Sequence, residues 1–360
     1  MEWRKEVEQI AAYVPGKSIE EVKQQYNLEE VHRLASNENP LGPSEKAQRA
    51  MQKAVLETHL YPDTSASALR EVLAETYHVN ADEIITGNGA DNVISIVVSA
   101  YVNEGDEVLY CTPTFPAYRS STLLMGGVPV EVPLRDDFTF DLHEMKEKIT
   151  KKTKLIFICN PNSPTGTIVD HEEIEAFIRD VPKDVLVVLD EAYIEYVDVE
   201  GYKTGIDLFK AGYNVLTIRT FSKFYSLAGL RVGYAIGTKK VLEPMLRLRE
   251  PFALNRVAIA GAVESIKDVA FGEKHMKMNR EEKLFITEQL AALGCKVYPS
   301  HTNFIFVDMK QDGVVLFEKL LEKGFIIRPC AGWGLQNYVR ISIGTHEQNK
   351  QFIDLLKDIL

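Results

Sequence analysis

The sequence has few cysteines, and no two of them have the spacing of a metal or redox motif. Its four cysteines, Cys111, Cys159, Cys295 and Cys330, lie far apart and form no C-x-x-C pair. Isolated cysteines are typical of a reducing compartment, and they argue against a zinc site or a disulfide framework. We therefore expect no metal centre and a cytoplasmic location.

Long hydrophobic runs and an excess of positive charge are also absent. The most apolar windows, residues 93–102 and 185–189, are too short to cross a bilayer. The charged residues 1–6 lack the apolar segment of a signal peptide. The net charge is −11, with no run rich in Lys or Arg. We expect a soluble protein with neither a membrane nor a nucleic acid as its partner.

Short apolar runs alternate with amphipathic segments through the first two thirds of the chain. Seven runs are candidate strands: residues 83–86, 107–111, 128–132, 155–159, 185–190, 215–220 and 232–236. Helix-like segments lie between them: residues 66–77, 91–101, 116–125, 141–149 and 171–179. Non-alternating Val, Ile and Leu strands separated by helices indicate an α/β fold, with a mostly parallel sheet of seven strands between helices.

The pattern changes near residue 243. Two long helical stretches come first, followed by short strands and a closing helix: residues 243–269, 272–293, 296–298, 304–308, 325–328, 338–343 and from about 346. This part predicts a smaller α+β domain, and 360 residues are enough for two domains. We expect an N-terminal arm at 1–35 associated with the small domain, a large domain at 36–250 and the small domain at 251–360.

The segment 220–234 carries the most specific chemistry. Lys223 follows a buried-type strand and is flanked by hydroxyl residues, and Arg231 comes two helical turns later. A lysine at the end of a buried strand is costly unless its amine is paired or converted to an imine. Ser222 and Arg231 provide a hydroxyl and a planar cation, which suit a phosphate. The segment predicts a pocket for pyridoxal 5′-phosphate (PLP) bound as a Schiff base, the alternative being a surface lysine.

Further candidates follow other strands, where ligands of open parallel sheets bind. Asp190 can keep a pyridine nitrogen protonated, or it can be a helix cap or a structural ion pair. Tyr193 can donate to a phenolic oxygen, and Phe115 can stack on a ring, although both also suit simple packing. Arg328 and Arg340 lie on strands of the small domain, as solvent-facing residues or as a wall for an anion.

Two turns complete the set. Residues 87–92 form a glycine turn that opens a helix, where free N–H groups can bind a phosphate. This turn lacks the third glycine of a dinucleotide fingerprint, and its nearest downstream acids, Asp106 and Glu107, lead into the next strand, so an oxidoreductase is disfavoured. Residues 160–167 form a rigid turn with polar tips at the end of another strand. Either turn can also be purely structural.

Together these segments resemble the PLP-dependent aminotransferases of fold type I, and within them the histidinol-phosphate aminotransferases. The resemblance extends over nearly the whole chain and rests on residues 34–42, 61–63, 87–91, 160–166, 190–193, 220–223 and 230–234. It implies an aspartate-aminotransferase-like fold and a homodimer with shared active sites.

The resemblance also implies a role for each site residue. Lys223 would form the Schiff base and move the proton, with Asp190 at the ring nitrogen, Tyr193 at the phenolic oxygen and Phe115 against the ring. Other residues would hold the phosphate: Ala90, Asp91, Thr220, Ser222, Arg231 and, from the neighbouring subunit, Tyr61. The substrate side would be lined by Tyr13, Asn37, Arg328 and Arg340.

The sequence departs from the family pattern at two places. Ser163 stands where an asparagine often contacts the phenolic oxygen, and Asn162 precedes it, so either residue is a candidate for that contact. Asn92 stands where an acid is common, which leaves the phosphate role of that side chain open.

The implied reaction transfers the amino group of L-histidinol phosphate to 2-oxoglutarate, giving imidazole-acetol phosphate and L-glutamate in histidine biosynthesis. One alternative is an aminotransferase for aromatic amino acids, and another is a PLP-dependent decarboxylase of a phosphorylated amino acid. A regulator with an aminotransferase-like domain is disfavoured, because the arm before Asn37 is too short for a DNA-binding domain.

Overall fold

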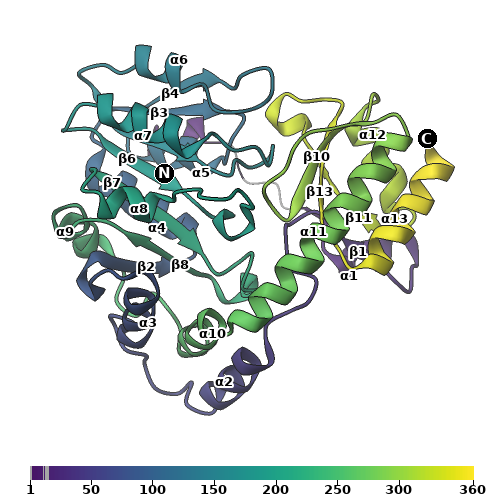
Figure 1. Ribbon diagram of the computed structural model, residues 1–360, viewed down its shortest axis with the longest axis horizontal. Coiled ribbons are helices and arrows are strands. Elements are labelled where there is room, and N and C mark those ends of the chain that lie inside the picture. The colour runs from purple at the N-terminus through teal and green to yellow at the C-terminus, as the bar shows by residue number, and fades with distance from the viewer. Residues whose placement is uncertain (1, 11, 13–15) are drawn as a thin grey trace.

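A computed structural model describes residues 2–10, 12 and 16–360 of the chain. Tyr13, expected on the substrate side, lies outside the described residues. The molecule has two bodies (Figure 1). The large sheet and its helices form the body on the left of the view, and a smaller body built around β10 and β13 lies on the right. The long helix α11 (Val269–Ala292) runs from α10 of the first body to the second.

The large sheet has seven strands in the order β2-β8-β7-β6-β5-β3-β4. The strands are β2 (Ile84–Asn88), β3 (Glu107–Thr112), β4 (Val128–Pro133), β5 (Thr153–Cys159), β6 (Leu186–Asp190), β7 (Val215–Thr220) and β8 (Val232–Ile236). Strand β8 is antiparallel to both of its neighbours, and the other pairs are parallel. The predicted α/β fold with a mostly parallel seven-stranded sheet is confirmed.

Six helices cover this sheet and bury its Val, Ile and Leu side chains in the main core: α4 (Ala90–Tyr101), α5 (Ala117–Leu124), α6 (Leu142–Glu147), α7 (His171–Asp180), α8 (Gly205–Lys210) and α9 (Lys239–Leu248). Helices α3 (Ser67–Tyr77) and α10 (Arg256–Lys267) pack with β2 and β8 in a second cluster, and α2 (Glu45–Val55) packs on α10. Burial on both faces explains why the strands are continuously apolar.

The predicted single helix over residues 243–269 is wrong. Helix α9 ends at Leu248 and α10 begins at Arg256. Pro251 lies between them and disfavours a helical conformation at Glu250. Asn255 then caps α10, because its side chain accepts a hydrogen bond from the N–H of Ala258 at 2.8 Å.

The second body contains a four-stranded sheet and a two-stranded one. Its elements are α1 (Ile19–Tyr26), β1 (His32–Arg33), β9 (Lys296–Val297), β10 (Phe304–Asp308), α12 (Gly313–Leu321), β11 (Phe325–Ile326), β12 (Arg328–Pro329), β13 (Tyr338–Ser342) and α13 (His346–Ile359). The predicted strand 325–328 is two strands in different sheets, β11 with β1 and β12 with β13. The N-terminal segment therefore pairs with the second body, while the exact domain boundaries stay a prediction.

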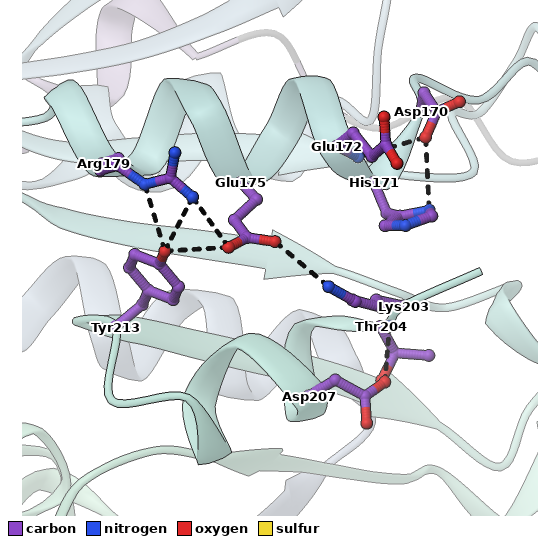
Figure 2. Close-up of polar contacts among 9 residues, drawn as sticks. All are labelled: Asp170, His171, Glu172, Glu175, Arg179, Lys203, Thr204, Asp207 and Tyr213. Atoms are coloured by element: carbon purple, nitrogen blue, oxygen red, sulfur yellow. Dashed lines mark hydrogen bonds and ion pairs between the residues drawn. The ribbon is translucent and has the colours of Figure 1, made fainter. Parts of the chain in front are cut away.

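A polar network on α7 shows how the outer helices are fixed (Figure 2). Glu175 accepts hydrogen bonds from Tyr213 at 3.0 Å, from Arg179 at 3.0 Å and from Lys203 at 3.5 Å. The Tyr213 hydroxyl is the main cause that lowers the pKa of Glu175. The network joins α7 to the segments before α8 and β7, and its charges are paired among themselves.

No helix within residues 2–10, 12 and 16–360 has the length and apolar character needed to cross a membrane.

Candidate active site

The predicted site residues gather where the parallel strands of the large sheet end. Strands β5, β6 and β7 end at Cys159, Asp190 and Thr220, and β2 ends next to the start of β8 because Asn88 pairs with Val232. Since β8 runs in the opposite direction, Arg231 just before it lies at the same edge of the sheet. The topology brings together segments that are far apart in the sequence, such as Asp91 and Arg231, which are separated by 140 residues.

The glycine turn after β2 forms one half of an anion cradle. Helix α4 begins at Ala90, and its N-cap residue Gly89 provides no side-chain cap for the free N–H groups of the first turn. Gly89 has φ +83°, and a Cβ there would lie 2.3 Å from Arg231 Nη2. A Cβ at Gly233 would lie 2.3 Å from the carbonyl carbon of Gly89. Both glycines are therefore needed for the close approach of this turn to β8 and Arg231.

Arg231 and two hydroxyl groups form the other half of the cradle. Arg231 Nη1 donates to Ser222 Oγ at 3.2 Å, and Nη2 donates to Asp91 Oδ2 at 3.0 Å. Thr220 Oγ1 lies 3.0 Å from Ser222 Oγ. Free helix N–H groups, a guanidinium and hydroxyls at one point suit a phosphate group. This chemistry fits the phosphate of PLP.

The side chain of Asn92, at the position where an acid is common in the family, forms a hydrogen bond within the glycine turn. Its side-chain oxygen accepts a hydrogen bond from the N–H of Asn88 at 3.1 Å, which closes the glycine turn. The uncharged amide thus holds the backbone that presents the N–H groups of α4.

Lys223 lies between the strand ends and the second body. Its Nζ donates to the carbonyl of Ser36 at 3.1 Å and lies 5.9 Å from the centre of the Tyr193 ring. The Tyr193 hydroxyl accepts a hydrogen bond from Asn37 Nδ2 at 2.8 Å. Asn37 is in turn fixed by Ser342 of β13, whose Oγ donates to Asn37 Oδ1 at 3.0 Å. The Asn37 side chain therefore joins the tyrosine of the large sheet to the small sheet.

Asp190 is a buried carboxylate, with 3% of its surface exposed. Its Oδ2 accepts from the Tyr118 hydroxyl at 2.5 Å, and its Oδ1 accepts from the N–H of Ala192 at 3.2 Å. Burial raises the pKa of Asp190 to about 6, although these two hydrogen bonds lower it. A positively charged group brought by a ligand would stabilise the ionised form.

The structure separates the two candidates at the turn after β5. Asn162 is fully engaged inside the turn, because its oxygen accepts from Thr114 at 2.7 Å and its nitrogen donates to Pro113 and Thr165. Ser163 Oγ instead accepts from Arg340 Nη1 at 3.1 Å. Ser163 is therefore the residue of this pair that faces the second body.

Arg328 and Arg340 are direct partners across the antiparallel pair β12–β13. Like charges in this position repel each other, so an anion between or beside them would be stabilising. Arg340 also donates to the carbonyl of Ala35 at 2.7 Å, and Arg328 lies 5.7 Å from the ring centre of Trp333. The indole of Trp333 donates to the carbonyl of Thr114 at 3.0 Å, which joins this wall to the large sheet.

One predicted residue is not brought to the others. Tyr61 is 80% exposed and stacks on Phe252, and its carbonyl accepts from Arg256. Among the residues that the structure describes, no hydrogen bond or ring contact joins Tyr61 to Lys223. Its predicted contact with a neighbouring subunit stays untested.

Sequence reasoning missed several residues that hold the site together. They come from other elements: Tyr118 donates to Asp190, Ser342 to Asn37, and Trp333 to the carbonyl of Thr114. A signal existed for Tyr118, because it follows the ring candidate Phe115 by only three residues, at the start of the predicted helix 116–125. The Phe115 ring lies 5.9 Å from that of Tyr118, edge to face.

Comparison with known proteins identifies the family. The sequence profile "Aminotransferase class I and II" matches residues 29–356. The chain belongs to the class I and II aminotransferases.

Two curated full-length relatives of this aminotransferase are histidinol-phosphate aminotransferases. The histidinol-phosphate aminotransferase of Moorella thermoacetica is 44% identical over 99% of this chain and 92% of its own length. That of Bacillus subtilis strain 168 is 40% identical over 100% of both chains. The solved structure of histidinol-phosphate aminotransferase from Sinorhizobium meliloti in complex with pyridoxal 5′-phosphate has a TM-score of 0.90 and 26% identity, covering 99% of this chain and 97% of that one.

Within residues 2–10, 12 and 16–360, no group of three or more His, Cys, Asp or Glu side chains is placed to hold a metal ion.

Proposed function

We propose that this aminotransferase uses PLP to transfer the amino group of L-histidinol phosphate to 2-oxoglutarate, giving imidazole-acetol phosphate and L-glutamate. The observation that carries the proposal is the position of Lys223 between two separate anion sites. The cradle of Arg231 lies at the end of β7, where Arg231 donates to Ser222. Arg340 of β13 donates to Ser163, which follows the end of β5. The names of its full-length relatives support the same substrate.

The residues at the strand ends fit the cofactor. The phosphate would be held by the N–H groups of Ala90 and Asp91 and by the side chains of Thr220, Ser222 and Arg231. Asp190 would pair with the ring nitrogen, Phe115 would lie against the ring, and Tyr193 with Ser163 or Asn162 would contact the phenolic oxygen. When bound, PLP supplies an electrophilic aldehyde and a ring that withdraws electrons from the substrate carbon.

Lys223 is the group that moves the proton. Its Nζ would remove a proton from the substrate carbon that bears the amino group and deliver a proton in the reverse half-reaction. The carbonyl of Ser36 is an acceptor 3.1 Å away that can orient this amine. Asn37 fixes the Tyr193 hydroxyl on the side of the second body, so both groups keep a defined place relative to the substrate.

The arginine wall of Arg328 and Arg340 favours a phosphorylated amine over an aromatic amino acid. Arg328 and Arg340 oppose each other across β12 and β13, and an anion beside them would offset the repulsion between their like charges. A phosphate of histidinol phosphate or a carboxylate of 2-oxoglutarate meets this need in each half-reaction. An aromatic amino acid also offers one anionic group, but its carboxylate carries a single negative charge, whereas a phosphate monoester carries about −1.5 to −2 at pH 7, so the two arginines favour the phosphate.

We further propose a cytoplasmic homodimer in which Tyr61 reaches the cofactor phosphate of the partner subunit. The segment 55–61 exposes large apolar side chains, with Leu56 and Tyr61 each 80% exposed and Leu60 52% exposed. Exposed apolar residues in one segment are typical of an interface. Sedimentation of the purified chain should give twice the monomer mass, and Tyr61→Phe should weaken PLP binding without dissociating the dimer.

Single-turnover kinetics with different amine donors test the proposed substrate. The purified chain with PLP is mixed with L-histidinol phosphate, phenylalanine or phosphothreonine, and the oxo product is quantified. We expect histidinol phosphate to react fastest by at least about tenfold. A faster reaction of phenylalanine would assign an aromatic substrate, and release of carbon dioxide from phosphothreonine would assign a decarboxylase.

A further inference from the structure

The hydroxyl of Tyr118 is buried directly beside the carboxylate of Asp190. Tyr118 lies on α5 and is 0% exposed, and its hydroxyl donates to Asp190 Oδ2 at 2.5 Å. Its ring stacks on Phe157 with 4.4 Å between centroids and 15° between planes. The Phe115 ring packs against the Tyr118 ring edge to face, with 5.9 Å between centroids. Aromatic packing thus fixes the position of the hydroxyl independently of any ligand.

We propose that Tyr118 is a positioning residue for the transamination, which keeps the Asp190 carboxylate ionised and oriented for the ring nitrogen of PLP. This inference rests on the proposed function and adds to it a residue that would not touch the cofactor nitrogen itself.

The groups around Asp190 explain why this donor matters. Cys159 is its register partner on β5, Asp91 and Glu191 are nearby acids, and Ala192 offers one N–H. Burial and the two acids raise the pKa of Asp190, whereas Tyr118 and Ala192 lower it. Burial and Asp190 also raise the pKa of Cys159 to about 12, so the thiol stays neutral.

The buried cation Arg219 is directed at the neighbouring carboxylate Glu191 and not at Asp190. Arg219 gives two hydrogen bonds to Glu191 Oε2, at 2.8 and 3.0 Å. Tyr118 is therefore the side chain whose hydrogen bond opposes protonation of Asp190. Burial, together with the charge of Asp190, raises the pKa of Tyr118 well above its ordinary value, so its hydroxyl remains a donor at every working pH.

Loss of this hydroxyl has a specific consequence. Without it, Asp190 keeps a single donor, binds a proton more readily and attracts a protonated ring nitrogen less. The phosphate cradle at Arg231 is separate from this contact and would be unchanged. The effect should therefore depend on the nitrogen of the cofactor ring and not on its phosphate.

The test compares two ligands on the full-length chain stripped of cofactor. One is PLP, and the other is its deaza analogue, in which a carbon replaces the ring nitrogen. Dissociation constants are measured by fluorescence titration for wild type, Tyr118→Phe and the matched control Tyr110→Phe. Tyr110 is an equally buried tyrosine whose hydroxyl bonds to Glu131 at 3.0 Å instead of to Asp190. Thermal unfolding of each variant is recorded without ligand.

We expect Tyr118→Phe to weaken PLP binding by about 10- to 100-fold, the effect of a lost hydrogen bond to a charged group. Binding of the deaza analogue should change by less than about twofold, and Tyr110→Phe should change neither. In an Asp190→Asn background, Tyr118→Phe should have little further effect on PLP binding. In the loaded enzyme, the acid limb of the pH profile of kcat should move to higher pH.

Three results would overturn the inference. Equal weakening of both ligands, or a Tyr118→Phe chain that unfolds well below Tyr110→Phe, would assign Tyr118 a packing role. Unchanged PLP affinity in a folded Tyr118→Phe chain would show that Asp190 needs no such donor. A wild-type chain that does not bind PLP would overturn the proposed function and this inference with it.

Discussion

Two consecutive carboxylates at the end of β6 have opposite surroundings. Glu191 forms a buried ion pair with Arg219, in which both side chains are at most 6% exposed. Asp190 is equally buried, but its two hydrogen bonds come from the Tyr118 hydroxyl and the N–H of Ala192. Successive residues of a strand face opposite sides of the sheet. The carboxylate that supports the fold has its cation within the chain, whereas the one at the site receives neutral donors only.

Two arginines of neighbouring segments repeat this difference. Burial alone would lower the pKa of Arg219, but Glu191, with Tyr77 and Tyr234, raises it well above its ordinary value. Arg231 is 41% exposed, and its partner Asp91 is 56% exposed. Glu191 and Arg219, which we call the structural side, neutralise each other within the chain. Asp190, Lys223 and Arg231 with Asp91, which we call the ligand side, are arranged for a ligand that brings both a phosphate and a positive ring nitrogen.

The largest effect should come from the amine on the ligand side. Lys223→Ala should lower the turnover of histidinol phosphate by about 10⁴-fold, because the group that moves the proton is lost. Its free energy of unfolding should change by less than about 1 kcal/mol, since Lys223 is only partly buried and donates to the carbonyl of an exposed residue, Ser36. Turnover assays and urea titrations measure the two quantities. Retention of full activity would remove Lys223 from the mechanism.

The opposite outcome is expected on the structural side. Glu191→Gln should lower the free energy of unfolding by about 3–5 kcal/mol, because it leaves Arg219 buried without its counter-charge. The matched control is Glu175→Gln in the network of Figure 2, where Glu175 is half-buried but its partner Arg179 is exposed, and this change should cost less than about 1 kcal/mol. Urea unfolding of both variants without ligand checks the prediction. Equal stabilities would mean that burial of the Glu191–Arg219 pair contributes nothing to the fold.

Asp190→Asn should separate activity from stability. Turnover should fall by about 10²–10³-fold, as expected when a charge that acts on the reacting system is removed. The pKa of Asp190 is raised from 3.8 to about 6, so its ionisation opposes folding by up to about 3 kcal/mol above pH 6 and has no effect below about pH 4.

The ligand-free variant should therefore be more stable than wild type at pH 7, by about 1–2 kcal/mol, because the new amide loses part of the gain to unpaired N–H groups. This advantage should disappear as the pH falls to 4. Unfolding curves at the two pH values measure it. A variant that is less stable than wild type at pH 7 would contradict the assigned cost of this charge.

The sequence predicts the ligand side better than the structural side, for a physical reason. Lys223, Asp190 and Arg231 each follow or precede an apolar strand, and in a parallel sheet such positions meet at one edge. Tyr118 and Arg219 are positioned by packing between elements, and nothing in their local sequence indicates their partners. The break between α9 and α10 had a local signal in Pro251, which the long helical periodicity outweighed. Contacts across the chain, such as Asn37 with Ser342, need the fold itself.

The smallest effect should come from the exposed pair of the ligand side. Asp91→Asn removes the carboxylate that accepts from Arg231 at 3.0 Å and keeps the N–H groups of α4. Because both partners are exposed, the free energy of unfolding should change by less than about 1 kcal/mol. PLP should bind up to about fivefold more tightly at low salt, since a negative charge near the phosphate is gone, and the gain should disappear at about 1 M salt. Fluorescence titration at two salt concentrations measures this, and a tenfold loss of affinity would instead make the Asp91 carboxylate a necessary part of the cradle.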